Sequence, residues 1–459
     1  MATQEDEPGQ PPALTSLSLA ATAECITPKE QIITPFDVSG GTDEQGKLLA
    51  IDYDKIVGKF GATRIDKALL EKFERVTGQR PHRFLRRGIV FSHRELDTIL
   101  DRYEKGLPFF LYTGRGPSSD SMHVGHAVPF EFTKWLQDVF DAPLVIMLTD
   151  DEKFLHSPKL KVEDVKRFTR QNAKDIIAVG FDLKKTFIFA DFDYVKGALY
   201  ENAIQIARRT TVSQIKGTFG FDDSNNIGEM VFPAIQSATA FATSFPHIFG
   251  SNKKKAASVP CLIPCAIDQD PYFRQCRDNA KQLGYIKPSL LHAVFLPALQ
   301  GPGSKMSASV PDSGIFLNDT AKDIQKKVNK YAFSGGQDTV EKHRELGGRT
   351  KDDVPFQYLT FFMEDDEALE KIRADYEKGD LLTGELKKIC IQELQSYVKG
   401  FQDRRTKVTD EVVDESMRER KLVFRGNFNP PEGDDEKRKR VKALKAELDK
   451  LEAEIKPSA

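Results

Sequence analysis

Long apolar runs and early basic residues are what this sequence lacks most clearly. No run of about 18 apolar residues occurs, so we expect no membrane span. No Lys or Arg precedes Lys29, which argues against a secretory signal and against an arginine-rich mitochondrial presequence. Cysteine is scarce, and the Cys261-x3-Cys265 pair has poor zinc spacing and no fourth ligand nearby. We therefore expect buried free thiols, no metal held by protein ligands, and a cytoplasmic location.

Neither sign of charge dominates the composition. The 67 basic and 69 acidic residues give a net charge of −2, so a nucleic-acid partner is neither indicated nor excluded. Any basic patch would have to be local. With 459 residues, 30% of them charged and 39% hydrophobic, the chain has the composition of a soluble protein of two or three domains.

From Phe109 onward, apolar runs alternate with helical patterns. The helical patterns include 162–179 and 270–283, ended by Gly180 and Gly284. The strand-like runs are 109–113, 144–149, 186–190, 261–266 and 290–295. This alternation predicts an α/β fold with a doubly wound, mostly parallel sheet. Ligands of such sheets bind beyond the carboxyl ends of the strands, where the strand order reverses.

Changes in composition divide the chain. The segment His82–Tyr103 is rich in arginine and aromatic residues, and we interpret it as a packed pair of surface helices, with RNA contact as the alternative. The expected parts are a disordered N-terminal tail (1–48), an extension packed on the α/β domain (49–105), the Rossmann-like α/β domain (106–312) with a long insert (191–257), a helical domain (313–425) and a charged C-terminal tail (426–459).

The stretch Gly114–His126 lies between a predicted strand and a predicted helix. Gly, Pro and Ser in such a loop allow backbone N–H groups and the positive helix end to face a phosphate. The loop lacks both the third glycine of a dinucleotide fingerprint and the Gly-Lys-Ser/Thr of a P-loop. It carries instead His123 and His126, which share one face of the first helical turn, and Gly125, which has no Cβ to obstruct a flat ring.

Two further polar clusters follow predicted strands. One is Thr149–Lys153, and the other is the Lys-Met-Ser-Ala-Ser run at 305–309, in a Gly-Pro-Gly-Ser loop. A His-x-Gly-His motif alone is as often structural as functional. Combined with a Lys-Met-Ser loop in an α/β pattern, it becomes strongly specific.

These motifs resemble the two signatures of class I aminoacyl-tRNA synthetases, His-Ile-Gly-His and Lys-Met-Ser-Lys-Ser. The chain is most similar to the tryptophanyl-tRNA synthetases of the eukaryotic cytoplasm, from about Ile51 to Phe424. The N-terminal helix-turn-helix module of vertebrate members has no counterpart in residues 1–48. Ala308 stands where many class I members have Lys, which leaves the charge to Lys305. The matching blocks are 112–119, 149–153, 233–236, 266–274 and 332–336.

The resemblance implies activation of L-tryptophan by ATP, followed by transfer of tryptophan to the 3′ end of tRNA(Trp). Mg²⁺ would bridge phosphate oxygens and rely little on protein ligands. The catalytic residues implied are His123, His126, Lys305 and Ser307. The implied ATP-binding residues are Gly114, Gly116, Pro117, Ser118, Gly125, Met306 and Ser309.

The resemblance also implies a tryptophan pocket. Its residues are Tyr112, Glu152, Gln236 and Gln269, with Glu152 suited to the α-ammonium group and Tyr112 to the indole N–H. Met147 departs from the family, because human-like members carry Gln there, and a thioether accepts hydrogen bonds only weakly. We therefore expect this chain to reject indole analogues without the N–H less strongly.

The insert carries aromatic residues, including Phe219, Phe221, Phe241 and Phe245, that we expect to be exposed on a single chain. By resemblance it forms the interface of a C2 homodimer, and the helical domain binds the tRNA anticodon. Three alternatives stay open: a tyrosyl-tRNA synthetase, a small-molecule nucleotidyltransferase, and a catalytically silent RNA-binding relative.

Overall fold

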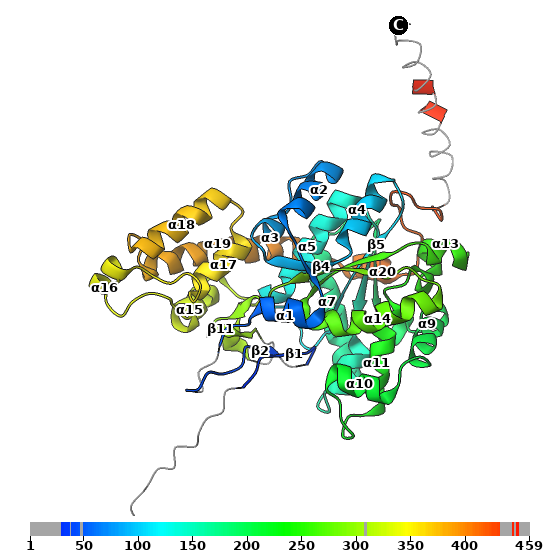
Figure 1. Cartoon of the computed structure of the whole chain (residues 1–459), viewed down its shortest axis with the longest axis horizontal. Helices are drawn as coiled ribbons and strands as arrows, with labels where there is room; N and C mark the ends of the chain where they lie inside the picture. Colours follow the sequence, from blue (N-terminus) through cyan, green and yellow to red (C-terminus); the bar gives the residue numbers. More distant parts are fainter. Residues whose placement is uncertain are drawn as a thin grey trace, which may run out of the picture.

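A seven-stranded sheet forms the centre of the computed structural model, which describes residues 29–36, 38–45, 49–306, 310–431, 443–444 and 447–448 (Figure 1). The strand order is β3-β4-β9-β8-β5-β6-β7. The five strands from β9 to β7 are parallel, whereas β4 runs antiparallel to both β9 and β3. The bounds are β3 Thr63–Arg64, β4 Val90–Arg94, β5 Phe110–Arg115, β6 Leu144–Leu148, β7 Thr186–Ala190, β8 Cys261–Ala266 and β9 Ser289–Ala293. The predicted α/β fold and all five predicted strands are confirmed.

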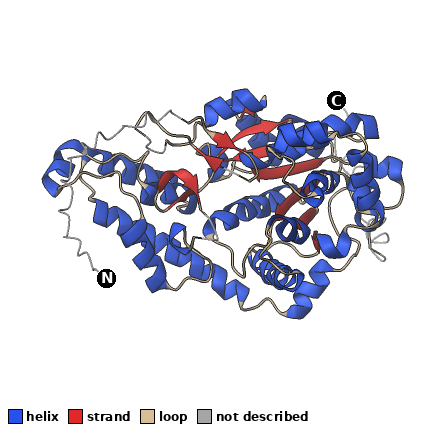
Figure 2. Ribbon diagram, turned by 90° about the horizontal axis from the view of Figure 1, so that it is seen from below, coloured by secondary structure: helices blue, strands red, loops and turns tan. Residues whose placement is uncertain are grey.

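Helices cover both faces of this sheet (Figure 2). Alternate strand residues point to opposite faces. Leu144, Ile146 and Leu148 of β6 join a core with α4, α5 and α7, while Val145 and Met147 join a second core with α9, α11 and α14. The helices of these layers are α4 Leu96–Glu104, α5 Val124–Phe140, α6 Asp150–His156, α7 Val162–Ala178, α8 Asp191–Tyr194, α9 Gly197–Ala207, α10 Val212–Phe219, α11 Ile227–Ala238, α12 Pro246–Phe249, α13 Lys253–Ala257 and α14 Asp270–Leu283.

The topology locates the ligand-binding edge. From the central strand β5, the chain continues outward through β6 and β7 on one side, and β8 and β9 lie on the other. Strand order therefore reverses between β5 and β8, the position where a crevice opens at the carboxyl ends of a parallel sheet.

The expected helix pair at 82–103 is wrong in its centre. Only α3 (Arg83–Arg86) and α4 are helical, and β4 between them pairs with β9. Val90 and Phe91 are buried, since β4 extends the sheet in the antiparallel direction. Helical periodicity could not reveal this strand, because its register is set by β9, which lies about 200 residues further along the chain.

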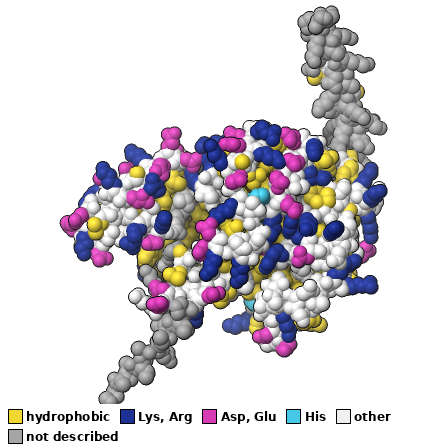
Figure 3. Space-filling model, viewed as in Figure 1, with side chains coloured by type: hydrophobic (Ala, Val, Ile, Leu, Met, Phe, Trp, Pro, Cys, Tyr) yellow, Lys and Arg dark blue, Asp and Glu magenta, His cyan; other side chains and the backbone are white. Residues whose placement is uncertain are grey.

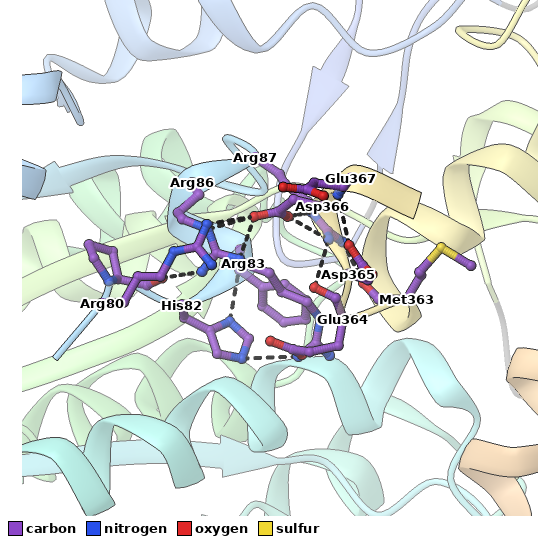
Figure 4. A network of polar contacts seen from close by, with 12 residues as sticks. Arg80, His82, Arg83, Arg86, Arg87, Met363, Glu364, Asp365, Asp366 and Glu367 are labelled. Carbon is purple, nitrogen blue, oxygen red and sulfur yellow. Dashed lines mark hydrogen bonds and ion pairs between the residues drawn. The ribbon is translucent and has the colours of Figure 1, made fainter. Parts of the chain in front are cut away.

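The arginines of this segment bind the chain's own helical region (Figure 4). Arg83 donates to the Phe361 carbonyl (2.8 Å) and to Glu364 (2.6 Å), and it also pairs with Glu131. Arg86 and Arg87 both hold Asp366. These contacts, which we call the α3–α18 network because Asp366 begins α18 (Asp366–Lys378), connect the sheet domain to the helical lobe.

The helical lobe lies beside the sheet domain, at the yellow to orange end in Figure 1. Arg405 of α19 pairs with Asp175 of α7 at 2.7 Å, which joins the two regions a second time. The chain then returns to the sheet domain, where Leu422 and Phe424 are buried in the second core. The helices of the lobe are α15 Ala321–Tyr331, α16 Val340–Leu346, α17 Val354–Phe362, α18 Asp366–Lys378 and α19 Thr383–Arg405, whereas α20 Asp410–Met417 packs on β7 and α7 of the sheet domain.

The segment predicted as a disordered tail contains two paired strands in its described part, so the prediction is wrong for residues 29–36 and 38–45. Strands β1 (Ile32–Ile33) and β2 (Val38–Ser39) pair, and the Gly40 N–H donates to the Gly303 carbonyl at 3.4 Å. Gly303 belongs to β11 (Gly301–Lys305), which pairs with β10 (Pro297–Ala298). Backbone pairing with a distant strand leaves no mark on composition. Two more helices, α1 (Tyr53–Phe60) and α2 (Lys67–Thr77), complete the extension.

The aromatic residues of the insert are not exposed, contrary to the prediction. Phe219, Phe221, Phe241 and Phe245 are all buried within one chain, in the second core. The large apolar side chains that the insert does expose lie elsewhere: Phe192, Tyr200, Ile204, Val212, Ile227 and Val231.

The outer surface mixes both signs of charge, as the face in Figure 3 shows. Within the described ranges, no helix combines the length and the apolar character needed to cross a membrane. Of the expected charged tail, Asn427 and Asn429 are held by backbone carbonyls, and most of the rest lies outside the described residues.

Candidate active site

A cavity of about 460 Å³ opens at the carboxyl ends of β5, β8 and β9. It lies at the reversal of strand order, where the sequence predicted a ligand. The sequence-predicted residues that line it are Tyr112, Gly114, Gly116, Ser118, His123, Gly125, His126, Glu152, Gln236, Gln269 and Met306. Pro117 does not line it, and Ser307 and Ser309 lie outside the described residues.

The two histidines enter the cavity from the start of α5. His123 is the N-cap residue, and its ring stacks on that of His126 with centroids 3.5 Å apart. The bond from the Val124 N–H to the Ile315 carbonyl (2.9 Å) ties this turn to the chain that follows the Lys-Met-Ser loop. The imidazoles and the positive end of α5 therefore face the same space, as anion binding requires.

Close approach explains two glycines of the loop. A Cβ at Gly125 would stand 3.1 Å from His123 Nδ1 and 3.4 Å from Met306 Sδ. At Gly116 it would stand 2.1 Å from Lys153 Cε. Any larger residue at either position would displace a side chain that lines the cavity.

The Lys-Met-Ser loop begins beside the histidine turn. Lys305 ends β11, and the next residue, Met306, is buried next to Gly125 and Gly314. The backbone thus brings the two signature motifs to one cavity from positions far apart in the sequence, as the sequence analysis expected.

Charged residues of β5 and α6 line one wall of the cavity. Glu152 Oε2 lies 2.8 Å from Lys153 Nζ. Arg115 lines the same cavity, and burial lowers the pKa of its guanidinium to about 10, which still leaves it charged at neutral pH. Neither Lys153 nor Arg115 was assigned a role from the sequence, although both lie inside matching blocks, Arg115 at the end of β5 and Lys153 in α6.

The opposite part of the cavity is suited to an aromatic amino acid. Tyr112 is buried, packs edge-on against Phe273, and donates its hydroxyl to Met147 Sδ at 3.2 Å. Gln236 on α11 donates to Gln269 Oε1 at 3.4 Å, so the insert and the segment after β8 meet here. Burial raises the pKa of the Tyr112 phenol, which keeps the hydroxyl protonated.

Further lining residues were not foreseen. Asp268 comes from a block that matched the family, and its position after β8 was a usable signal. Pro35 and Phe36 come from the N-terminal segment 29–36, for which the sequence carried no signal. Phe36 stacks on His156 with centroids 5.5 Å apart, which closes the cavity on that side.

No three His, Cys, Asp or Glu side chains in the described part of the chain are grouped as a metal site would require. The cysteines of that part, Cys261, Cys265, Cys276 and Cys390, are free thiols.

Comparisons with known proteins agree with this geometry. The model of the family "tRNA synthetases class I (W and Y)" matches residues 104–399. The fold and the two motifs at one cavity therefore define a class I tRNA synthetase.

Comparison with individual relatives identifies the branch of the family more narrowly. The chain is 58% identical over 396 residues to the cytoplasmic tryptophan–tRNA ligase of Saccharomyces cerevisiae, covering 86% of this chain and 91% of that one. It is 56% identical over 398 residues to the human cytoplasmic enzyme, covering 86% and 82%. A tryptophanyl-tRNA synthetase of Encephalitozoon cuniculi, solved with bound tryptophan, superposes with a TM-score of 0.73 at 43% identity, covering 81% and 98%. The chain belongs to the tryptophan–tRNA ligase family.

Proposed function

We propose that this chain joins L-tryptophan to ATP to form tryptophanyl-adenylate and pyrophosphate, and then transfers tryptophan to the 3′ end of tRNA(Trp) in the cytoplasm. The observation that supports this most is the meeting of the histidine turn, Met306 of the second signature and the Glu152–Gln236–Gln269 side in one cavity. Membership of the family, whose named relatives are cytoplasmic, gives the amino acid and the location.

In the proposed reaction, the tryptophan carboxylate attacks the α-phosphate of ATP, and pyrophosphate leaves. Negative charge on the phosphate oxygens must be held meanwhile, so catalysis rests on positioning and electrostatics. His123 and His126 donate to the phosphates from the turn, and Lys305 with Ser307 and Ser309 acts from the second loop. Lys153 and Arg115 add positive charge on the cavity wall. ATP enters as its Mg²⁺ complex, in which phosphate oxygens hold the ion.

Glu152 is the proposed partner of the α-ammonium group, and Gln236 and Gln269 bind the amino and carboxylate ends. Gly114, Gly116, Ser118, Gly125 and Met306, which line the cavity, are the proposed ATP-binding residues, and Pro117 is proposed to shape the loop that carries them. Residues 313–425 are proposed to bind the anticodon.

The chain is also proposed to form a C2 homodimer. The insert exposes Tyr200, Ile204, Val212, Ile227 and Val231 on α9, α10 and the start of α11, and exposed apolar side chains of this number mark an interface. Ile227, the most exposed at 82%, is the position to test. Ile227→Glu should halve the mass measured by light scattering, and an unchanged mass would contradict this interface.

ATP–pyrophosphate exchange tests the activity. Wild-type protein should exchange with tryptophan and not with tyrosine, which separates the two amino acids that the family model covers. Lys305→Ala should lower the rate by about 10²–10³ with an unchanged melting temperature, the usual cost of losing one charge-stabilising donor. Exchange with neither amino acid would refute the proposal.

A further inference from the structure

A buried polar chain lies behind the amino-acid side of the cavity. Arg94 holds Asp270 through two bonds, Nε to Oδ1 at 2.8 Å and Nη2 to Oδ2 at 2.9 Å. His292 Nε2 lies 3.0 Å from Asp270 Oδ1, and Ser92 Oγ lies 3.0 Å from His292 Nδ1. Asp270, His292 and Ser92 are all inaccessible to solvent. The four residues come from β4, α14 and β9 (Figure 1).

The chemistry fixes the direction of each bond. A carboxylate only accepts, so His292 donates from Nε2 and accepts the Ser92 hydroxyl proton at Nδ1. Burial lowers the pKa of His292, so its imidazole stays neutral. Burial alone would raise the pKa of Asp270, but the bonds from His292 and Arg94 outweigh it and hold that pKa at about 2. Arg274 Nε also lies 3.2 Å from Asp270 Oδ2, so the buried carboxylate faces two guanidinium groups as well as the neutral imidazole.

The position of Asp270 links this chain to the substrate. Asp270 is the first residue of α14 and directly follows Asp268 and Gln269, which both line the cavity. Gln269 is the N-cap residue of α14 and makes no capping bond with its side chain, so the anchor at this helix start is Asp270. Arg94 also donates to the carbonyls of Phe60 and Gly61, which ties the anchor to the N-terminal extension.

We propose that Asp270 is a positioning residue: clamped by Arg94 and His292, it sets the start of α14 so that Gln269 and Asp268 face the bound amino acid. The proposal rests on the proposed function. It assigns the extension at 49–105 a task in the binding of tryptophan, performed by Arg94 of β4 without contact with the substrate.

Asp270→Asn tests the proposal in ATP–pyrophosphate exchange. The amide keeps the shape but turns an N–H group toward a donor. We expect the KM for tryptophan to rise about tenfold, below the ~100-fold cost of a 1 Å misplacement, while the KM for ATP changes less than about twofold. Asp353→Asn is the matched control, since Asp353 is equally buried, is the N-cap residue of α17, and accepts from Tyr376 at 2.8 Å in the helical lobe. Both substitutions remove a buried carboxylate, but only the first lies behind the cavity.

A rise in the KM for tryptophan confined to Asp270→Asn supports the proposal. An unchanged KM for tryptophan, or an equal rise in Asp353→Asn, overturns it. If Asp270→Asn does not fold, Arg94→Lys replaces it as the test, because lysine keeps the charge but cannot make the bidentate contact with Asp270. A selective rise in the KM for tryptophan in Arg94→Lys supports the proposal, and an unchanged KM overturns it. Exchange by wild-type protein tests the proposed function separately, so the two can fail independently.

Discussion

The substitution Tyr112→Phe, which removes the hydroxyl, should show how this chain recognises the indole ring of tryptophan. The hydroxyl donates to Met147 Sδ at 3.2 Å, and a thioether sulfur has no proton to give back. The Tyr112 oxygen also has a side-chain hydrogen bond with Thr239, which leaves one lone pair for a donor in the cavity. The indole N–H of tryptophan is the donor that we expect there.

The magnitude follows from burial. Tyr112 is only 1% exposed, so Tyr112→Phe would leave the indole N–H without a partner in a site that water does not reach. An unsatisfied buried donor costs about 1–3 kcal/mol. At 1.4 kcal/mol per factor of ten, kcat/KM for tryptophan should fall by about 5- to 150-fold. An analogue with sulfur in place of the indole nitrogen has no N–H group that could be left without a partner, so its kcat/KM should fall less than about twofold in Tyr112→Phe.

The assay is ATP–pyrophosphate exchange with tryptophan and with the sulfur analogue, for the wild type, Tyr112→Phe and Met147→Gln. Glutamine offers a carbonyl oxygen of similar reach, so Met147→Gln should increase the preference for tryptophan over the analogue. Equal relative losses for both substrates in Tyr112→Phe would refute the assignment of Tyr112 to the indole N–H. An unchanged preference in Met147→Gln would refute the expectation of weak rejection.

Three other predictions concern stability, the histidine turn and pH. Arg83→Ala removes the ion pairs with Glu131 and Glu364 and should cost about 3 kcal/mol of stability, since it leaves the partly buried Glu131 carboxylate without this partner. The fluorescence of Trp135, the single tryptophan, should then report a lower melting temperature, whereas Arg373→Ala, at an exposed position, should leave the melting temperature unchanged. Gly125→Ala places a Cβ 3.1 Å from the His123 ring, so kcat/KM for ATP should fall about tenfold or more at an unchanged melting temperature. An unchanged kcat/KM for ATP would contradict the importance of this close approach. Burial raises the pKa of Asp150 from 3.8 to about 6, so the stability that its protonated form contributes is complete below pH 3.8 and is lost as the pH rises through 6. Between these two pH values the melting temperature of Asp150→Asn should fall less than that of the wild type. An identical pH dependence of the two melting temperatures would count against this assignment.

Local signals in the sequence were enough to predict the five parallel strands and the edge of the sheet where the cavity opens. Each of the five parallel strands is a short apolar run with turn residues at its ends, and such runs stay readable because both faces of the strand are buried. Gly284 ends α14 with a positive φ of 75°, the backbone conformation that its position predicted. Polar residues directly after strands then marked the edge where the cavity opens.

Non-local contacts set the limits of that prediction. Strand β4 was missed because its partner β9 lies about 200 residues away, and the burial of Phe219 and Phe245 was missed because their neighbours come from other helices. The N-terminal residues Pro35 and Phe36 reached the cavity without any motif. Neither the hydrophobic periodicity of a segment nor its composition shows which distant segment will cover a given side chain.

By itself, the sequence determined the five parallel strands and the helices between them, the family, and the residue types available for binding ATP and tryptophan. The tertiary structure alone decided that Met147 accepts a hydrogen bond from the Tyr112 hydroxyl and that Arg94 and His292 hold Asp270 at the start of α14. The physical reason is that strand and helix formation depend on neighbours in sequence, whereas a hydrogen bond between buried groups exists only after the chain has folded and excluded water.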